Sequence, residues 1–118
     1  MIIRAFLKDA DFLANFQAKP GVWRLRVTGG SGKAGAVPGG LLDMGWAKDV
    51  RTPLRTMRHD LVVRGKAPDW VPLEQLQVEV EYSATAETDA EAALAEYVRR
   101  NRQLPPFQRE QKPEARRP

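Results

Sequence analysis

Two segments of this sequence alternate between apolar and polar residues, and they constrain the possible folds more than any other feature. Residues 76–82, Leu-Gln-Val-Glu-Val-Glu-Tyr, place an apolar side chain at every second position, and residues 22–28, Val-Trp-Arg-Leu-Arg-Val-Thr, do so again from Trp23 onward. A strand points successive side chains to opposite faces, so each segment predicts a strand with one buried face. Such strands need a second layer of structure to cover that face.

Two other segments predict helices. Thr52, which a proline follows, is a typical helix start, and this helix is expected to end near Arg64. A second helix is expected to begin with Thr88 or Asp89 as its cap and to run to about Arg102. In both segments the apolar residues recur at helical spacing, which indicates one buried stripe on each helix.

The predicted fold class is α+β, in one small domain. Residues 2–7 and 41–46 add two shorter candidate strands, so the expected architecture is a mixed sheet of three or four strands with two or three helices. A chain of 118 residues has the length of a single domain, and 42% hydrophobic residues suffice for a core. The compact domain is expected to span residues 1–103, with its strand order left open.

Two stretches are expected to lie outside the regular elements. Residues 29–40 contain six of the nine glycines, which predicts a long loop that is either mobile or moulded on a partner. Residues 104–118 carry four prolines and mixed charge, which predicts an extended C-terminal arm.

Charge is distributed in three blocks. Residues 1–66 have a balance of +7, residues 67–98 a balance of −8 with no lysine or arginine, and residues 99–118 a balance of +5. The blocks either neutralise each other within one chain or meet oppositely charged surfaces on other copies or on a larger partner.

Composition excludes several classes of site. The chain has no cysteine and one histidine, which excludes disulfides, cysteine-based metal sites and thiol nucleophiles, so no cofactor or metal is expected. No apolar run approaches the roughly 18 residues of a membrane span, and the N-terminus has no signal-peptide pattern. We therefore expect no membrane partner and a cytoplasmic location.

No catalytic motif survives a check of its spacing. Residues 28–34 resemble part of a phosphate-binding loop, but that loop needs a hydroxyl residue where Ala34 stands and a glycine where Val27 stands. His59 and Asp60 are adjacent on a predicted helix and so do not face each other. The chain is therefore not expected to be an enzyme or to take a small-molecule substrate.

A basic stripe is the first candidate binding surface. On one continuous helix, the spacing of Lys48, Arg51, Arg55 and Arg58 would place them along one face, from which they could follow phosphates. If Thr52 caps the helix, however, only Arg55 and Arg58 lie firmly on that face. A solvated helix face is the simpler alternative.

The polar face of the strand at residues 22–28 offers a continuation of this surface. Arg24 and Arg26 point to the same side and could extend the basic patch. Alternatively, they pair with Glu79 and Glu81 on a neighbouring strand. The two glutamates share one strand face and could bind a divalent ion, although solvated outer-face acids are the commoner case.

Aromatic residues and the arm supply candidate protein contacts. Trp46 and Trp70 lie in loop-like surroundings, where tryptophan either anchors an interface or closes the end of a small core. Phe107 is the aromatic residue of the expected arm, and Arg116 and Arg117 lie near its end. These five residues are the predicted protein-interface residues.

The leading functional hypothesis is a non-enzymatic assembly or binding subunit. It would dock on a larger protein complex, or on copies of itself, through the glycine-rich loop and the C-terminal arm. Ala, Arg, Gly and Pro make up 46 of 118 residues, a composition that fits a phage virion component or a phage-encoded inhibitor of a host machine, located in the virion or the host cytoplasm. The alternative is a small basic nucleic-acid-binding accessory protein.

Overall fold

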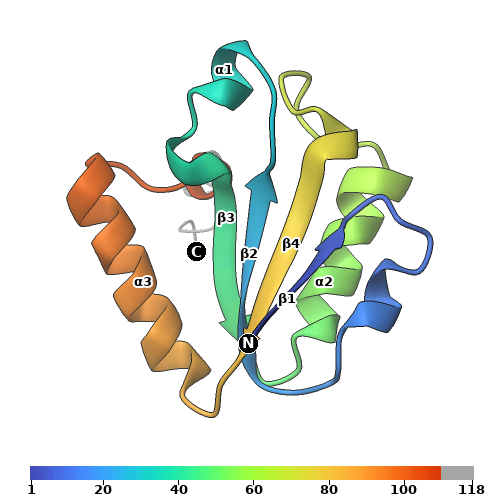
Figure 1. Ribbon diagram of the computed structural model, residues 1–118, viewed down its shortest axis with the longest axis vertical. Coiled ribbons are helices and arrows are strands. Elements are labelled where there is room, and N and C mark those ends of the chain that lie inside the picture. The colour runs from blue at the N-terminus through green and yellow to red at the C-terminus, as the bar shows by residue number, and fades with distance from the viewer. Residues whose placement is uncertain (110–118) are drawn as a thin grey trace, which may run out of the picture.

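The computed structural model describes residues 1–109 and contains one four-stranded antiparallel sheet (Figure 1). The strands lie in the order β1-β4-β2-β3. They are β1 (Ile2–Phe6), β2 (Gly21–Val27), β3 (Leu41–Ala47) and β4 (Leu76–Tyr82). The expected α+β class is confirmed, and both alternating segments are strands.

The sheet is antiparallel throughout rather than mixed. β1 and β2 run in the same direction, but β4 lies between them and pairs with both. In the same way β2 separates β3 from β4. Each pair of parallel strands is thus split by a strand of opposite direction, and no parallel neighbours remain.

One sheet face forms the main core. The register aligns Leu25 with Val78 and Val78 with Ala5, so one apolar row crosses three strands. Helix α2 (Arg51–Arg58) and a single π-helical turn at His59–Val63 cover this face through Leu54 and Leu61.

The start of α2 differs from the sequence-based expectation. The helix begins at Arg51. The backbone N–H of Arg51 donates a hydrogen bond to the carboxylate of Asp49, at 2.9 Å. Asp49 therefore supports the first turn instead of Thr52, which lies inside the helix. The expected single helix to Arg64 is divided into α2 and the π-helical turn.

Helix α3 (Ala86–Asn101) packs on the opposite sheet face (Figure 1). Ala86 and Ala90 contact Val22 and Met44, so α3 covers the half of the sheet formed by β2 and β3. The helix starts earlier than expected, at Ala86, so Asp89 lies in its first turn and is not the cap. From there the Asp89 carboxylate accepts hydrogen bonds from the hydroxyls of Ser83 and Thr85, which precede the helix.

The glycine-rich stretch is folded onto the domain. It contains the short helix α1 (Gly32–Gly35) and a 3-10 turn at Pro38–Gly40, and Ala34 is buried in the core. Gly40 has a φ of +70°, and a Cβ there would lie 2.4 Å from the carbonyl oxygen of Val27. This glycine therefore permits a close approach that no other residue allows.

The first residues of the expected arm also belong to the core. Pro105, Pro106 and Phe107 are buried, and the Phe107 ring packs edge-on against Trp70 with 6.4 Å between centroids. The composition of residues 104–118 as a whole predicted an extended arm from residue 104. That prediction is wrong for the first residues, because Phe107 and the two prolines before it have enough apolar surface to pack on the core. Residues 110–118 lie outside the described residues.

Phe107 and Phe6 provide a matched test of this packing. Phe107 is 6% exposed and Phe6 is 41% exposed. We expect Phe107→Ala to lower the free energy of unfolding by about 3 kcal/mol, because it removes a buried ring. The control, Phe6→Ala, should cost about 1 kcal/mol or less. Urea denaturation measures both, and equal losses would show that Phe107 is not part of the core.

Candidate functional site

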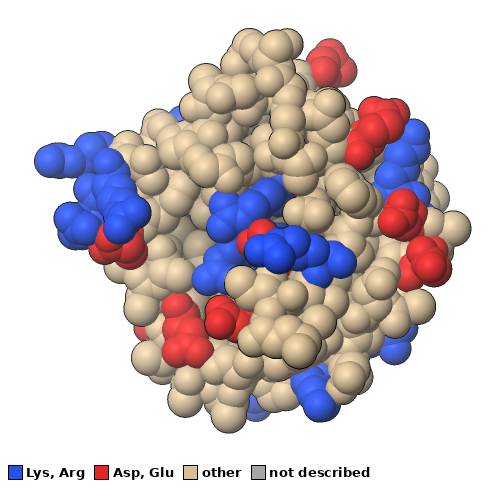
Figure 2. Space-filling view, viewed as in Figure 1, with Lys and Arg blue, Asp and Glu red and all other residues tan. Residues whose placement is uncertain are grey.

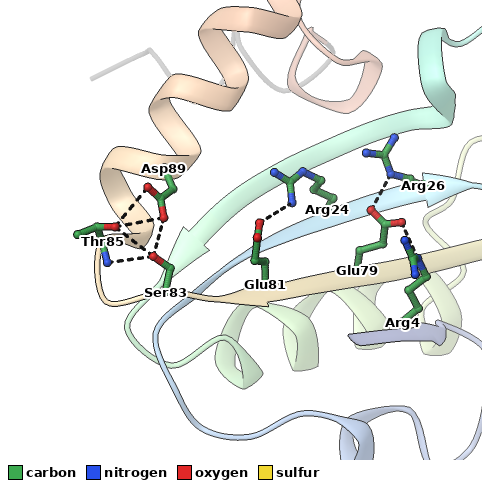
Figure 3. Close-up of polar contacts among 8 residues, drawn as sticks. All are labelled: Arg4, Arg24, Arg26, Glu79, Glu81, Ser83, Thr85 and Asp89. Carbon is green, nitrogen blue, oxygen red and sulfur yellow. Dashed lines mark hydrogen bonds and ion pairs between the residues drawn. The ribbon is translucent and has the colours of Figure 1, made fainter. Parts of the chain in front are cut away.

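The sheet face on which α3 packs also presents charged side chains from three strands. The alternation that buries the apolar residues points Arg4 of β1, Glu79 and Glu81 of β4, and Arg24 and Arg26 of β2 to this side (Figure 3). The same register therefore builds the core on one face and a row of ions on the other.

Glu79 lies at the centre of this row and holds an arginine on each side. Its two carboxylate oxygens accept hydrogen bonds from the Nε of Arg4 at 2.9 Å and the Nε of Arg26 at 2.8 Å. Glu79 is only 8% exposed, and burial alone would raise its pKa. The hydrogen bonds and charges of Arg26 and Arg4 outweigh burial, so the pKa of Glu79 lies below its usual value.

A second carboxylate is shared in the same way near the end of α3. Glu96 accepts hydrogen bonds from Arg99 and Arg100, at distances between 2.6 and 2.9 Å. These bonds, first from Arg99 and then from Arg100, lower the pKa of Glu96 to about 2. Arg24 and Glu81 form a one-to-one pair, with the longer separation of 3.8 Å.

We call these eight residues the arginine face. It contains five arginines and three glutamates, so it has two positive charges in excess; the members are Arg4, Arg24, Arg26, Glu79, Glu81, Glu96, Arg99 and Arg100. Figure 2 shows basic side chains gathered in and beside a hollow near the centre of this view. A guanidinium has five N–H donors, so the arginines keep donors for a further anion.

The hollow is a cleft of about 330 Å³ between α3 and the strands beneath it. Arg24, Arg26 and Arg100 line it together with Tyr97 of α3. The Tyr97 hydroxyl is buried and has no hydrogen-bond partner among the described residues. Burial raises the pKa of Tyr97, although the charges of Arg109 and Arg26 partly oppose the shift. The cleft is thus lined by three arginines and Glu96, and the Tyr97 hydroxyl beside it is buried without a described partner.

The basic stripe predicted on α2 is not continuous with Arg24 and Arg26. α2 covers the core face of the sheet, whereas these two arginines lie on the opposite face. Arg58 donates hydrogen bonds to the backbone carbonyl oxygens of Leu7 and Lys8, at 2.9 and 3.4 Å. The structure therefore divides the predicted patch between the two sides of the sheet.

Within the stripe itself only part of the charge is exposed. Lys48 and Arg55 are exposed, but Arg51 has a buried Nε with no described partner, and Arg58 is engaged with the backbone as above. Only two of the four predicted cations are therefore fully exposed on this surface.

The predicted interface residues fall in different surroundings. Trp46 is exposed on the edge strand β3. Trp70 packs against the core, between the Phe107 ring and the ammonium of Lys33, which lies 4.7 Å from the Trp70 ring centroid. Phe107 is part of the core rather than of an exposed arm. Two further predicted residues, Arg116 and Arg117, lie outside the described residues.

The opposed charge blocks meet within the chain. Arginines from residues 1–66 pair with Glu79 and Glu81 of the acidic block, and Lys8 pairs with Glu74 at 3.1 Å. The alternative in which Arg24 and Arg26 pair with strand glutamates is confirmed.

Sequence reasoning missed four members of the arginine face, Arg4, Glu96, Arg99 and Arg100, and also Tyr97 of the cleft. Arg4 carried a signal, because it alternates with apolar residues in a short strand. Tyr97 and the charged residues of α3 were not among the predicted site residues. Their convergence depends on how α3 lies across the sheet, which no local pattern encodes.

The two strand glutamates allow a direct test of the central ion pairs. We expect Glu79→Gln to lower the free energy of unfolding by about 2 kcal/mol at pH 7, because it leaves Arg4 and Arg26 without their carboxylate. Glu81→Gln should cost about 0.5 kcal/mol or less, since its side chain is half exposed and its contact is long. Chemical denaturation measures both.

The cost of Glu79→Gln should also depend on pH. The pKa of Glu79 is lower in the folded state, so its contribution is complete above the unfolded-state pKa of about 4.3. It is lost as the pH falls through the lower folded-state value, where the wild-type side chain becomes neutral like glutamine. A wild-type to Glu79→Gln difference that stays constant from pH 7 to acid would contradict this assignment.

No family model, curated protein or solved structure matches this chain. Residues 1–109 contain no helix that is long and apolar enough to cross a membrane. In the same residues, no group of three or more histidine, aspartate or glutamate side chains is placed to hold a metal ion.

Proposed function

We propose that this chain is a non-enzymatic binding subunit that docks on an acidic surface of a partner protein through the arginine face. The observation that carries the proposal is the sharing of carboxylates. Glu79 and Glu96 each hold two arginines, so each group of three keeps one positive charge. A partner carboxylate can complete each group by accepting the remaining guanidinium donors.

Apolar residues beside the arginines favour a protein partner. Ile2 is 40% exposed and Phe6 is 41% exposed, and both point to the same side as Arg4 because they occupy alternate positions of β1. Arginine and aromatic residues together are typical of protein interfaces. A nucleic acid fits this surface less well, because a phosphate backbone offers no apolar partner for Ile2 and Phe6.

The arginine face replaces the loop and arm as the leading docking surface. The glycine-rich stretch and residues 104–109 pack on the domain, so deletion of residues 104–118 would remove Phe107 from the core. That deletion would therefore test folding together with docking. Membership of a larger assembly, in a phage or elsewhere, stays a prediction from size and composition.

Two defined probes test the proposal. One is a short peptide of aspartate and glutamate with two phenylalanines, and the other is a single-stranded oligonucleotide of equal charge. We expect the peptide to shift backbone amide signals in β1, in β4 and at the end of α3 in two-dimensional NMR spectra. Tighter binding of the oligonucleotide at the same residues would favour the nucleic-acid alternative and overturn the proposal.

A double variant removes the two excess positive charges of the arginine face and leaves each shared glutamate with one arginine partner. In Arg4→Gln with Arg100→Gln, Arg26 still pairs with Glu79 and Arg99 still pairs with Glu96. We expect peptide affinity to fall at least about tenfold. The matched control, Lys48→Gln with Arg55→Gln, has the same charge change outside the arginine face and should change affinity by less than about twofold. Equal losses in both variants would indicate attraction by net charge alone.

A further inference from the structure

A second hollow lies on the core side of the sheet, between α2 and the C-terminal segment. It has a volume of about 310 Å³, near the lower end of the range for small-molecule sites. Most of its wall is apolar: Trp23 and Leu25 of β2, Met57 of α2, Leu61 and Phe107 contribute to it. It is separated from the arginine face by the sheet itself.

One wall of this hollow carries the carboxylate of Asp43. The register pairs Asp43 of β3 with Leu25, so an acidic residue occupies a position in the apolar row of the sheet. Its Oδ1 accepts hydrogen bonds from the backbone N–H of Met44 at 2.9 Å and from the side-chain amide of Gln108 at 3.0 Å. Its Oδ2 accepts none from any described residue.

The electrostatics of Asp43 follow from this position. Burial raises the pKa of the Asp43 carboxyl, and the hydrogen bonds from Gln108 and Met44 oppose the shift only in part. A partly buried carboxylate with one unpaired oxygen gains most from a donor that is itself charged.

No cation among the lining residues balances Asp43. A second carboxylate, Asp60, lines the same hollow, and its contact with Arg64 is long, at 3.8 Å. The lining residues include neither lysine nor arginine. Trp23 and Phe107 add aromatic rings, which attract a cation placed over their faces.

We propose that this hollow binds an apolar molecule that carries a protonated amine. The apolar part lies among Trp23, Met57 and Phe107, and the ammonium group donates a hydrogen bond to Oδ2 of Asp43. The size of the hollow suits one or two rings with a short alkylamine chain. This site is independent of the proposed docking function, because it uses other residues on the other side of the sheet.

Two probes of the same shape test the charge requirement in the wild-type protein. Tryptamine carries an ammonium group, and tryptophol replaces it with a hydroxyl. We expect tryptamine to shift the indole N–H signal of Trp23 in two-dimensional NMR titrations, and to bind about tenfold more tightly than tryptophol. Equal affinities, or no shift at Trp23 at millimolar tryptamine, would overturn the proposal.

Variants then assign the ammonium contact. Asp43→Asn keeps the acceptor for Gln108 and Met44 but removes the charge, and should weaken tryptamine about tenfold without changing tryptophol. Glu91→Gln on α3 removes the same charge on the other side of the sheet and should leave affinity unchanged. If Asp43→Asn does not fold, Asp60→Asn at the more exposed rim should weaken tryptamine by a smaller factor. Equal tryptamine affinity in the wild-type protein and in Asp43→Asn would exclude Asp43 as the ammonium partner, and if that variant does not fold, equal affinities of the wild-type protein for tryptamine and tryptophol would do so.

Discussion

Glu79 in the middle of β4 joins three strands by charge as well as by backbone hydrogen bonds. β4 is central, so its polar side chains have a neighbour on each side, and a carboxylate buried there needs partners from both. Arg4 and Arg26 supply them. The opposite side of the same strand carries Val78 and Val80, which are fully buried. The position of β4 thus determines both the core and the charged surface.

The two sides of the sheet differ in cover and in charge. On the face where α3 packs, the arginine face extends from β1 to the end of α3 and contains more arginines than carboxylates. On the other face, α2 and the C-terminal segment enclose a hollow whose charged residues are aspartates. A small domain with opposite local charge on its two sides can present one side to an acidic partner and take a basic ligand on the other. Both proposals rest on this separation rather than on the net charge of the chain.

Several parts of the fold could be predicted from the sequence. The strands at residues 22–28 and 76–82 were identified from alternation, because a period of two is a local property of the backbone. The pairing of Arg24 and Arg26 with strand glutamates was one of two open alternatives. Predictions failed where a distant contact decided the outcome: Phe107 packs on Trp70, and the bonds from Arg58 to carbonyl oxygens at the end of β1 take it out of the basic stripe.

The sequence alone determined which residues share a face within each strand and helix, since backbone geometry repeats every two or 3.6 residues. It also determined the absence of cysteine chemistry and the uneven charge along the chain. Only the tertiary structure decided that β4 inserts between β1 and β2, that α3 covers half of one face, and that Asp43 lines an apolar hollow. These features join residues far apart in the chain, and they arise from packing and burial across the whole domain, which local periodicity does not specify.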